Sequence, residues 1–208
     1  GGTDLYDISE EIFVSLETLK KDLVRVRKKL KEYGLYANVA GSEVTLEGRE
    51  LDKRRLLSGI LYEEFNKNIM SLDMVQKAFP DYNMELLRDI VLTECKRYHY
   101  FINDYAMVNL ILDLVVSMDR IRKNCTFRTH VAEKHRYGIR ETEFSGRIAG
   151  RIKEAFAVRF TELEMEELTA LLVSHLMKVD YDTLNRDNIQ DFIGPECSKI
   201  VGKILDYL

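Results

Sequence analysis

Residues 102–124 hold the clearest pattern of hydrophobic and polar positions in the chain. The middle of this stretch is apolar except for three polar residues that recur every four positions. These residues are Asn109, Asp113 and Ser117. Because positions four apart share one side of an α-helix, the pattern predicts a buried helix with one narrow polar line, which Arg120 extends. This polar line is either the solvent-facing side of a bundle helix or the place through which the helix transmits a regulatory signal.

The ends of this helix and the neighbouring stretches also carry helix signals. Asn103 and Asn83 are typical N-cap residues, and Thr161 followed by Glu164 forms a capping box. Apolar residues then recur at helical spacing over residues 84–100, over residues 141–160 and after Thr161. The residues expected to face inward are Leu86, Leu87, Ile90, Val91, Leu92, Phe144, Ile148, Ile152, Phe156, Met165, Leu168, Leu172 and Leu176. Together these stretches predict a bundle of at least four helices.

In the bundle region, Gly146 and Gly150 are expected to permit close approach of a neighbouring helix. Residues 55–79 are helical in pattern with polar breaks at residues 66–68 and 71, and we interpret them as a connector. Residues 124–141 form an irregular basic segment that contains His130 and His135.

The N-terminal third has a different organisation. Residues 3–13 repeat apolar positions at helical spacing, and Ser15 can cap a second helix that Gly34 closes. Leu19, Leu23, Val26 and Leu30 form the expected inner stripe of that second helix, and lysines and arginines dominate its remaining surface. Weak alternation around Gly41 then predicts a small hairpin over residues 36–48. A capped helix, a basic helix and a hairpin in this order are typical of a winged helix-turn-helix that places its second helix in the major groove of DNA.

Composition excludes several other classes. The 208 residues carry a net charge of −4, with few glycines and only two prolines, which favours one or two mainly helical domains. Cys95, Cys125 and Cys197 show no paired spacing, so we expect neither disulfides nor a zinc site, and a reducing cytoplasm fits best. The sequence contains no targeting segment, no membrane-spanning stretch, no phosphate-binding loop and no nucleophile motif, so we expect neither membrane insertion nor enzyme activity.

The N-terminal residues resemble the Mga/MtlR-type helix-turn-helix of bacterial regulators. The resemblance rests on an S-x-x-T-x-x-x-D core at Ser15, Thr18 and Asp22, and on an L-x-G-x-E-x-x-x-R run. That run stands at Leu46, Gly48, Glu50 and Arg54. The resemblance implies that DNA is contacted by Ser15, Thr18, Lys20, Lys21 and Arg25. Only two glycines precede Thr3, so we expect that the domain lacks its first helix and that the chain is a fragment.

The bundle region resembles a phosphotransferase-system regulation domain. Its two signatures stand at residues 109–122, NLILDLVVSMDRIR, and at residues 160–168, FTELEMEEL. Such domains control sugar-responsive regulators through dimerisation and histidine phosphorylation. The resemblance places phospho-acceptor histidines at Asp113 and Leu171, where this sequence has none. Leucine cannot accept phosphate and an aspartate presents a constant charge, so ordinary phosphorylation control of this domain is in doubt. His175 lies one turn beyond Leu171 and is either a displaced acceptor or a packing residue.

These observations lead to one prediction for the whole chain. We expect a mainly α protein with a partial winged helix-turn-helix at 1–55, a connector at 56–82, a regulation domain at 83–182 and the start of a second one at 183–208. Its predicted function is that of a cytoplasmic, activator-type, DNA-binding transcription regulator responding to carbohydrate status. Expected partners are double-stranded DNA, a second copy of the chain and phosphotransferase-system proteins, with no cofactor and no metal. The alternatives are an RNA-binding antiterminator of the same family and a helical interaction or ligand-binding module without a nucleic-acid role.

Overall fold

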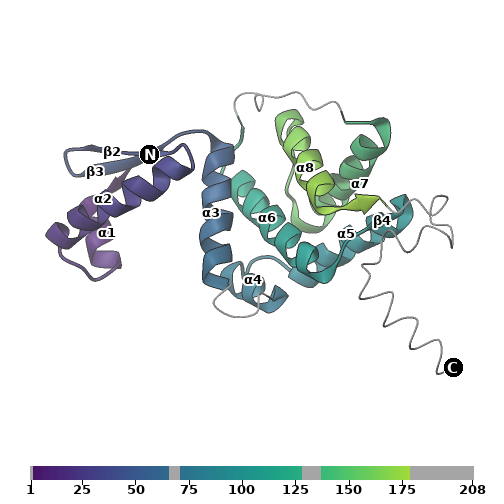
Figure 1. Cartoon of the computed structure of the whole chain (residues 1–208), viewed down its shortest axis with the longest axis horizontal. Helices are drawn as coiled ribbons and strands as arrows, with labels where there is room; N and C mark the ends of the chain where they lie inside the picture. Colours follow the sequence, from purple (N-terminus) through teal and green to yellow (C-terminus); the bar gives the residue numbers. More distant parts are fainter. Residues whose placement is uncertain (1, 66–70, 128–136, 179–208) are drawn as a thin grey trace, which may run out of the picture.

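The computed structural model describes residues 2–65, 71–127 and 137–178, and it places a winged helix beside a helical bundle (Figure 1). The mainly α fold with a small β wing is confirmed. The elements are β1 (Thr3–Asp4), α1 (Leu5–Glu11), α2 (Leu16–Glu32), β2 (Tyr36–Ala40), β3 (Glu43–Glu47), α3 (Glu50–Phe65), α4 (Leu72–Ala78), α5 (Met84–Tyr98), β4 (Tyr100–Phe101), α6 (Asp104–Arg122), α7 (Ile139–Phe156), α8 (Glu162–His175) and β5 (Met177–Lys178).

The wing is a three-stranded antiparallel sheet in the order β1-β3-β2. The hairpin of β2 and β3 turns at Gly41, whose φ of +65° suits glycine. The helix predicted over residues 3–13 begins only at Leu5, because Thr3 and Asp4 pair with β3 as a short strand. The side chain of Asp4 then caps α1 by accepting a hydrogen bond from the Tyr6 N–H at 2.7 Å.

Both predicted ends of α2 are confirmed. The Ser15 hydroxyl accepts from the Thr18 N–H at 3.1 Å, and Gly34 follows the helix with a φ of +70°. Leu19 and Leu30 are buried as expected, but Val26 is 46% exposed, so its place in the inner stripe was predicted wrongly. The physical reason is that α1 packs on α2 near its start, while β2 and α3 cover its last turn.

The main hydrophobic core is built around α6, which Figure 1 shows between α3, α5 and α8. Asn103 caps α6 as predicted, accepting from the Ala106 N–H at 2.7 Å. The buried residues of α6 are Met107, Leu110, Ile111, Leu112, Leu114, Val115, Val116 and Met118. The stretch interpreted as a connector contributes Phe65, Val75 and Tyr82 to the same core, so α3 and α4 pack on the bundle.

Helices α5, α7 and α8 complete the bundle. Their caps at Asn83 and Thr161 are confirmed, whereas Leu86, expected to face inward, is 41% exposed. Phe144, Ile148 and Ile152 of α7 are buried as predicted. The short strand β4, which precedes α6, pairs with the short strand β5, which follows α8.

The surroundings of two glycines of α7 differ from the prediction. No atom lies within 4 Å of the position that a Cβ would take at Gly146 or Gly150, among the residues described. The expected close approach of a neighbouring helix is therefore wrong for the described part of the chain.

Some predictions fall outside the described residues. They concern the polar break at 66–68, the histidines His130 and His135, Cys197, and the second regulation domain expected over 183–208.

Replacing Gly150 by alanine should stabilise the protein. A glycine in a helix interior costs about 1 kcal/mol relative to alanine, and the added methyl group meets no described atom within 4 Å. We therefore expect Gly150→Ala to raise the free energy of unfolding by up to about 1 kcal/mol, as measured by urea denaturation.

A matched control is Gly48→Ala. Its φ is +131°, and an added Cβ would lie 2.4 Å from Leu35 Cδ2. This variant should lose about 1–3 kcal/mol. Equal effects of the two substitutions would contradict the open space beside α7.

Candidate DNA-binding surface and regulatory cavity

The five residues predicted to contact DNA all lie exposed on α2 or at its N-cap. The Ser15 and Thr18 hydroxyls lie 2.9 Å apart and take part in the cap. Lys21 pairs with Glu17 at 2.7 Å, and Arg25 lies 3.8 Å from Asp22. These surface pairs are weak and can exchange for phosphate, so the structure leaves the cationic groups accessible.

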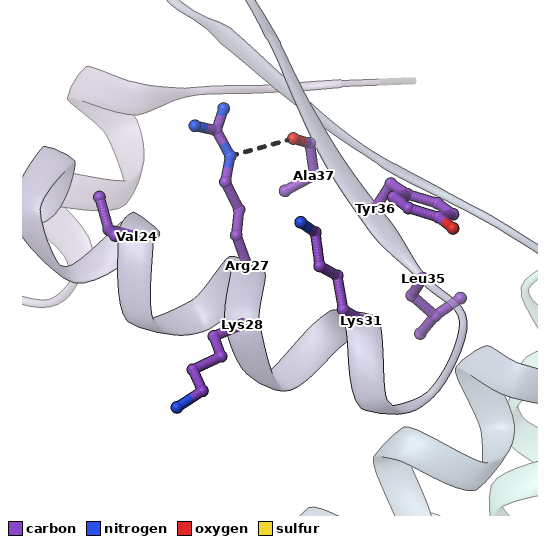
Figure 2. Close-up of a pocket in the computed structure, with 7 residues that line it drawn as sticks. All are labelled: Val24, Arg27, Lys28, Lys31, Leu35, Tyr36 and Ala37. Atoms are coloured by element: carbon purple, nitrogen blue, oxygen red, sulfur yellow. Dashed lines mark hydrogen bonds between the residues drawn. The ribbon is translucent and has the colours of Figure 1, made fainter.

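A groove of about 390 Å³ runs between α2 and the edge strand β2 (Figure 2). Its lining residues are Val24, Arg27, Lys28, Lys31, Leu35, Tyr36 and Ala37. Arg27 reaches across the groove and donates a hydrogen bond from Nε to the Ala37 carbonyl at 3.2 Å. In Figure 2 the side chain of Lys31 also extends from α2 towards β2, whereas that of Lys28 points away from the strand.

The predicted DNA-contacting set omitted the three cationic residues of this groove. Arg27, Lys28 and Lys31 lie three, four and seven positions after Val24, and this spacing places their backbone positions on one side of α2. This spacing is the feature of the sequence that could have identified these cationic residues. The proximity of β2, which turns this face into a groove, depends on the fold and cannot be seen in the residue pattern.

A buried network of charges joins α3 to α6 and α8. Arg54 of α3 binds Glu164 of α8 through two hydrogen bonds of 2.6 and 2.9 Å. Glu50, one turn earlier on α3, binds Arg120 of α6 through two hydrogen bonds of 2.7 and 2.8 Å, and this carboxylate raises the pKa of Arg120. Each pair is bidentate, the geometry that makes guanidinium–carboxylate pairs strong and directional.

Arg54 is enclosed on several sides. Its guanidinium also donates to the Cys125 carbonyl at 3.0 Å and lies 4.2 Å from the centre of the Phe127 ring. Glu164 in turn accepts a hydrogen bond from the Phe127 N–H at 3.1 Å. The capping-box interpretation is correct for the Thr161 hydroxyl, but the Glu164 carboxylate serves the buried pair, which the sequence pattern did not indicate.

Beside this network lies a cavity of about 330 Å³ between α3, α6 and α8. Its lining residues are Leu51, Arg54, Arg55, Ser58, Asp113, Ser117, Glu167, Ala170, Leu171, Ser174 and His175. The structure thus brings together both predicted acceptor positions, Asp113 and Leu171, with the candidate His175. The polar line of α6 faces this cavity at Asp113 and Ser117, so its interpretation as an ordinary solvent-facing side is wrong there.

Asp113 is held in a partly desolvated site, with 31% of its side chain exposed. Burial raises its pKa above 3.8, while a hydrogen bond from Ser58 and the nearby His175 act in the opposite direction. Because the pKa is higher in the folded state, ionisation of Asp113 reduces stability as the pH rises from 3.8 through the raised value. Burial likewise raises the pKa of Glu167, so the cavity holds two carboxyl groups whose charged forms are disfavoured.

The imidazole of His175 lies close both to its own helix, α8, and to the carboxylate of Asp113. Its Nδ1 lies 3.0 Å from the Leu171 carbonyl, and its Nε2 lies 3.8 Å from Asp113 Oδ2. The imidazole is therefore partly engaged by its own helix and close enough to Asp113 for an ion pair when protonated. Among the described residues no group of His, Cys, Asp and Glu has the arrangement of a metal site, and no helix is long and apolar enough to cross a membrane.

Comparisons with known proteins bear on both halves of the chain. Residues 1–59 match the family model of the Mga helix-turn-helix domain. The N-terminal part is therefore similar to Mga helix-turn-helix domains. The chain is also 23% identical over 204 residues to the transcriptional regulator ManR of Bacillus subtilis (strain 168), covering 96% of this chain and 30% of ManR.

A second relative from the same organism is the "Probable licABCH operon regulator", 24% identical over 175 residues. That match covers 83% of this chain and 27% of the regulator. The chain therefore spans less than a third of the length of these two relatives. Both matches extend well beyond the Mga domain into the helical bundle.

Breaking one side of the buried ion pair should destabilise the protein strongly. Arg54→Met leaves Glu164, whose side chain is 1% exposed, without its guanidinium partner. We expect a loss of about 3–5 kcal/mol in the free energy of unfolding. The double variant Arg54→Met with Glu164→Met should lose clearly less than the sum of the two single variants, as measured in a double-mutant cycle by urea denaturation.

The control for this cycle is Lys123→Met, which removes the exposed partner of Asp119. This variant should lose less than about 1 kcal/mol. A loss in Arg54→Met no larger than in the control would show that the network does not hold the helices together.

Proposed function

We propose that the chain is the DNA-binding part and a first regulatory part of a bacterial transcription regulator. The observation that carries this proposal is the coincidence of the Mga family match with a winged helix whose second helix is basic and exposed. The names of both relatives, a transcriptional regulator and an operon regulator, support it. An RNA-binding antiterminator is less well supported, because the N-terminal part has the helices and wing of a DNA-binding domain.

In this proposal α2 enters the major groove and the lysines on it bind phosphate. Lys20 and Lys21 lie on the exposed first turns of α2, and Ser15 and Thr18 lie at its N-terminus, where backbone N–H groups also favour an anion. The groove beside β2 adds Arg27 and Lys31 on the side of the wing. Arg25, on the remaining exposed side, completes the predicted set.

We further propose that the bundle is a phosphotransferase-system regulation domain with altered acceptor positions. Asp113 and Leu171 line one cavity, and each lies seven residues, about two helical turns, from a signature residue of the buried network, Arg120 or Glu164. A ligand or phosphoryl group in this cavity would lie against α3. Since leucine has no acceptor and Asp113 carries charge without phosphorylation, the proposed domain is biased towards one signalling state, with His175 as the available imidazole.

The route from the cavity to DNA in this proposal is α3. Glu50, at the start of α3, lies three residues after the end of β3 in the wing, and the same helix lines the cavity at Arg54, Arg55 and Ser58. A change in the packing of α6 or α8 against α3 would therefore shift the winged helix. In the cell the proposed regulator works in the cytoplasm as a homodimer and responds to phosphotransferase-system proteins.

The DNA-binding proposal predicts weak, salt-dependent binding by this chain. A fluorescent duplex should bind with a dissociation constant on the order of 10⁻⁵ M at moderate salt. Lys20→Glu with Lys21→Glu should weaken binding and lower the magnitude of the slope of log K against log salt by about 2, because two phosphate contacts are lost.

The control for charge alone is Lys96→Glu with Lys153→Glu, which makes the same change on exposed positions of the bundle. This variant should bind DNA like the parent chain. Equal weakening by the two double variants would mean that net charge, and not the surface of α2, determines binding.

The regulatory proposal predicts that the charge at Asp113 sets the output of the regulator. In a promoter–reporter strain, Asp113→Asn should change transcription because it removes the charge and keeps the shape. Asp113→His should make transcription depend on the sugar supply, since an imidazole can accept phosphate. Ser117→Ala, on the same face of the cavity, serves as the control, and unchanged output in both Asp113 variants would rule out the regulatory role.

A further inference from the structure

A second groove, of about 820 Å³, lies between α5 and α7 and belongs to neither the DNA-binding surface nor the regulatory cavity. Its charged lining residues are Glu94, Arg97, Glu143, Arg147, Arg151 and Glu154. Charged side chains from two helices are thus gathered around one open space. Figure 1 shows these two helices running beside each other in the bundle.

Glu94 forms the floor of this groove and is only 2% exposed. Its carboxylate lies 3.6 Å from Arg97 and 3.4 Å from Arg151, one arginine from each helix. Its Oε2 atom has no hydrogen-bond partner among the described residues. Arg97 Nη1 lies 3.6 Å from this oxygen, too far for a hydrogen bond, so the buried Oε2 lacks the donor that such an oxygen normally has.

A third guanidinium belongs to the same groove. Arg147 lies one turn before Arg151 on α7, and positions four apart share one helix face. Arg147 is exposed and makes no hydrogen bond or ion pair with any residue in the described part of the chain. Two anchored arginines and one unpaired arginine therefore surround the centre of the groove.

The absence of two side chains keeps the groove open. Gly146 and Gly150 line it, and a Cβ at either position would point into space where no described atom lies within 4 Å. Glycine weakens a helix interior, so two glycines on one face of α7 reduce stability and leave room above the backbone.

The charge balance at the centre favours an anion. Three guanidiniums and one buried carboxylate leave two positive charges, since three minus one is two. Glu143 and Glu154 also line the groove, but they lie towards its ends, four residues before Arg147 and three residues after Arg151. Both are exposed, so solvent and salt screen their effect more than that of the buried Glu94.

We propose that this groove binds a small phosphate monoester. A phosphate monoester carries nearly two negative charges at neutral pH and offers three acceptor oxygens, which match the forked donors of Arg97, Arg147 and Arg151. A hydroxyl group next to the phosphate donates to Oε2 of Glu94, which becomes accessible when the exposed Arg97 side chain turns onto the phosphate. This site is independent of the proposed DNA-binding function, and binding can be measured without DNA.

A second copy of the chain fits this groove less well. A two-fold packing of α7 against α7 would bring the arginines at the middle of one helix close to those of the other. Such like charges destabilise an interface unless each has a partner, and Glu94 is already shared by two arginines. The charge pattern therefore favours a small anion over a second α7.

The test is isothermal titration calorimetry of the 208-residue chain with glycerol 3-phosphate at low salt. We expect saturable binding at one site, weakened about tenfold or more in Arg147→Gln, because one charge-assisted contact is lost. Gly150→Leu should abolish binding by filling the groove while leaving the far-ultraviolet circular dichroism spectrum unchanged. Arg88→Gln is the control, since Arg88 lies on α5, pairs with Glu85 and does not line the groove.

Inorganic phosphate and glycerol distinguish the parts of the ligand. Phosphate should bind more weakly than glycerol 3-phosphate because it lacks the neighbouring hydroxyl, and glycerol alone should not bind. Phosphate binding as tight as that of the ester would overturn the monoester assignment. Equal binding of the ester to the parent chain and to Arg147→Gln, or no saturable binding to the parent chain, would overturn the site.

Discussion

The burial of Arg54 is the constraint on which the arrangement of the helices depends. A guanidinium cannot be deprotonated at any pH the fold survives, and an unpaired charge in a protein interior costs several kcal/mol or more. The side chain of Arg54 is 5% exposed, so the fold must supply a carboxylate, and α8 supplies it at Glu164. Glu50 and Arg120 make the equivalent pair with α6. Hydrophobic contacts alone allow helices to slide, whereas two bidentate pairs fix α3, α6 and α8 in register.

This constraint gives α3 a particular position between the two parts of the molecule. Leu56 packs in the small N-terminal cluster with Leu30 and Leu35, whereas Phe65, at the other end of the same helix, packs in the main core. One continuous helix therefore belongs to both hydrophobic cores. A helix transmits displacement along its length because its backbone hydrogen bonds hold each turn to the next. The ion pairs lie at the wing end of α3, so they determine how the winged helix is attached to the bundle.

The features that the sequence predicted correctly are mainly local. The caps at Ser15, Asn83, Asn103 and Thr161 each depend on a hydrogen bond within three residues, so the residue pattern contains the necessary information. Val26 and Leu86 were misplaced because their exposure depends on which other helix covers them. The same limitation applies to Glu164, whose partner Arg54 lies 110 residues earlier. The cavity at Asp113 combines both cases, since the polar line was visible in the sequence but the helices that face it were not.

In and beside the two stretches that resemble regulation-domain signatures, the residues that pair with α3 and the expected acceptor positions have different roles. Glu164 neutralises Arg54 of α3 in a buried pair, and Arg120 neutralises Glu50 of α3 in a partly buried pair. Asp113 and Leu171 are not tied to that network, so an imidazole can be absent from both positions without loss of the helix packing. Electrostatic contact with the network remains, since Arg54 and Arg55 both lower the pKa of Glu167 in the cavity, and Asp113 raises it. A change of charge inside the cavity therefore alters the electrostatic energy of Arg54, the residue that fixes α3, whether that charge comes from a phosphoryl group, a ligand or a proton.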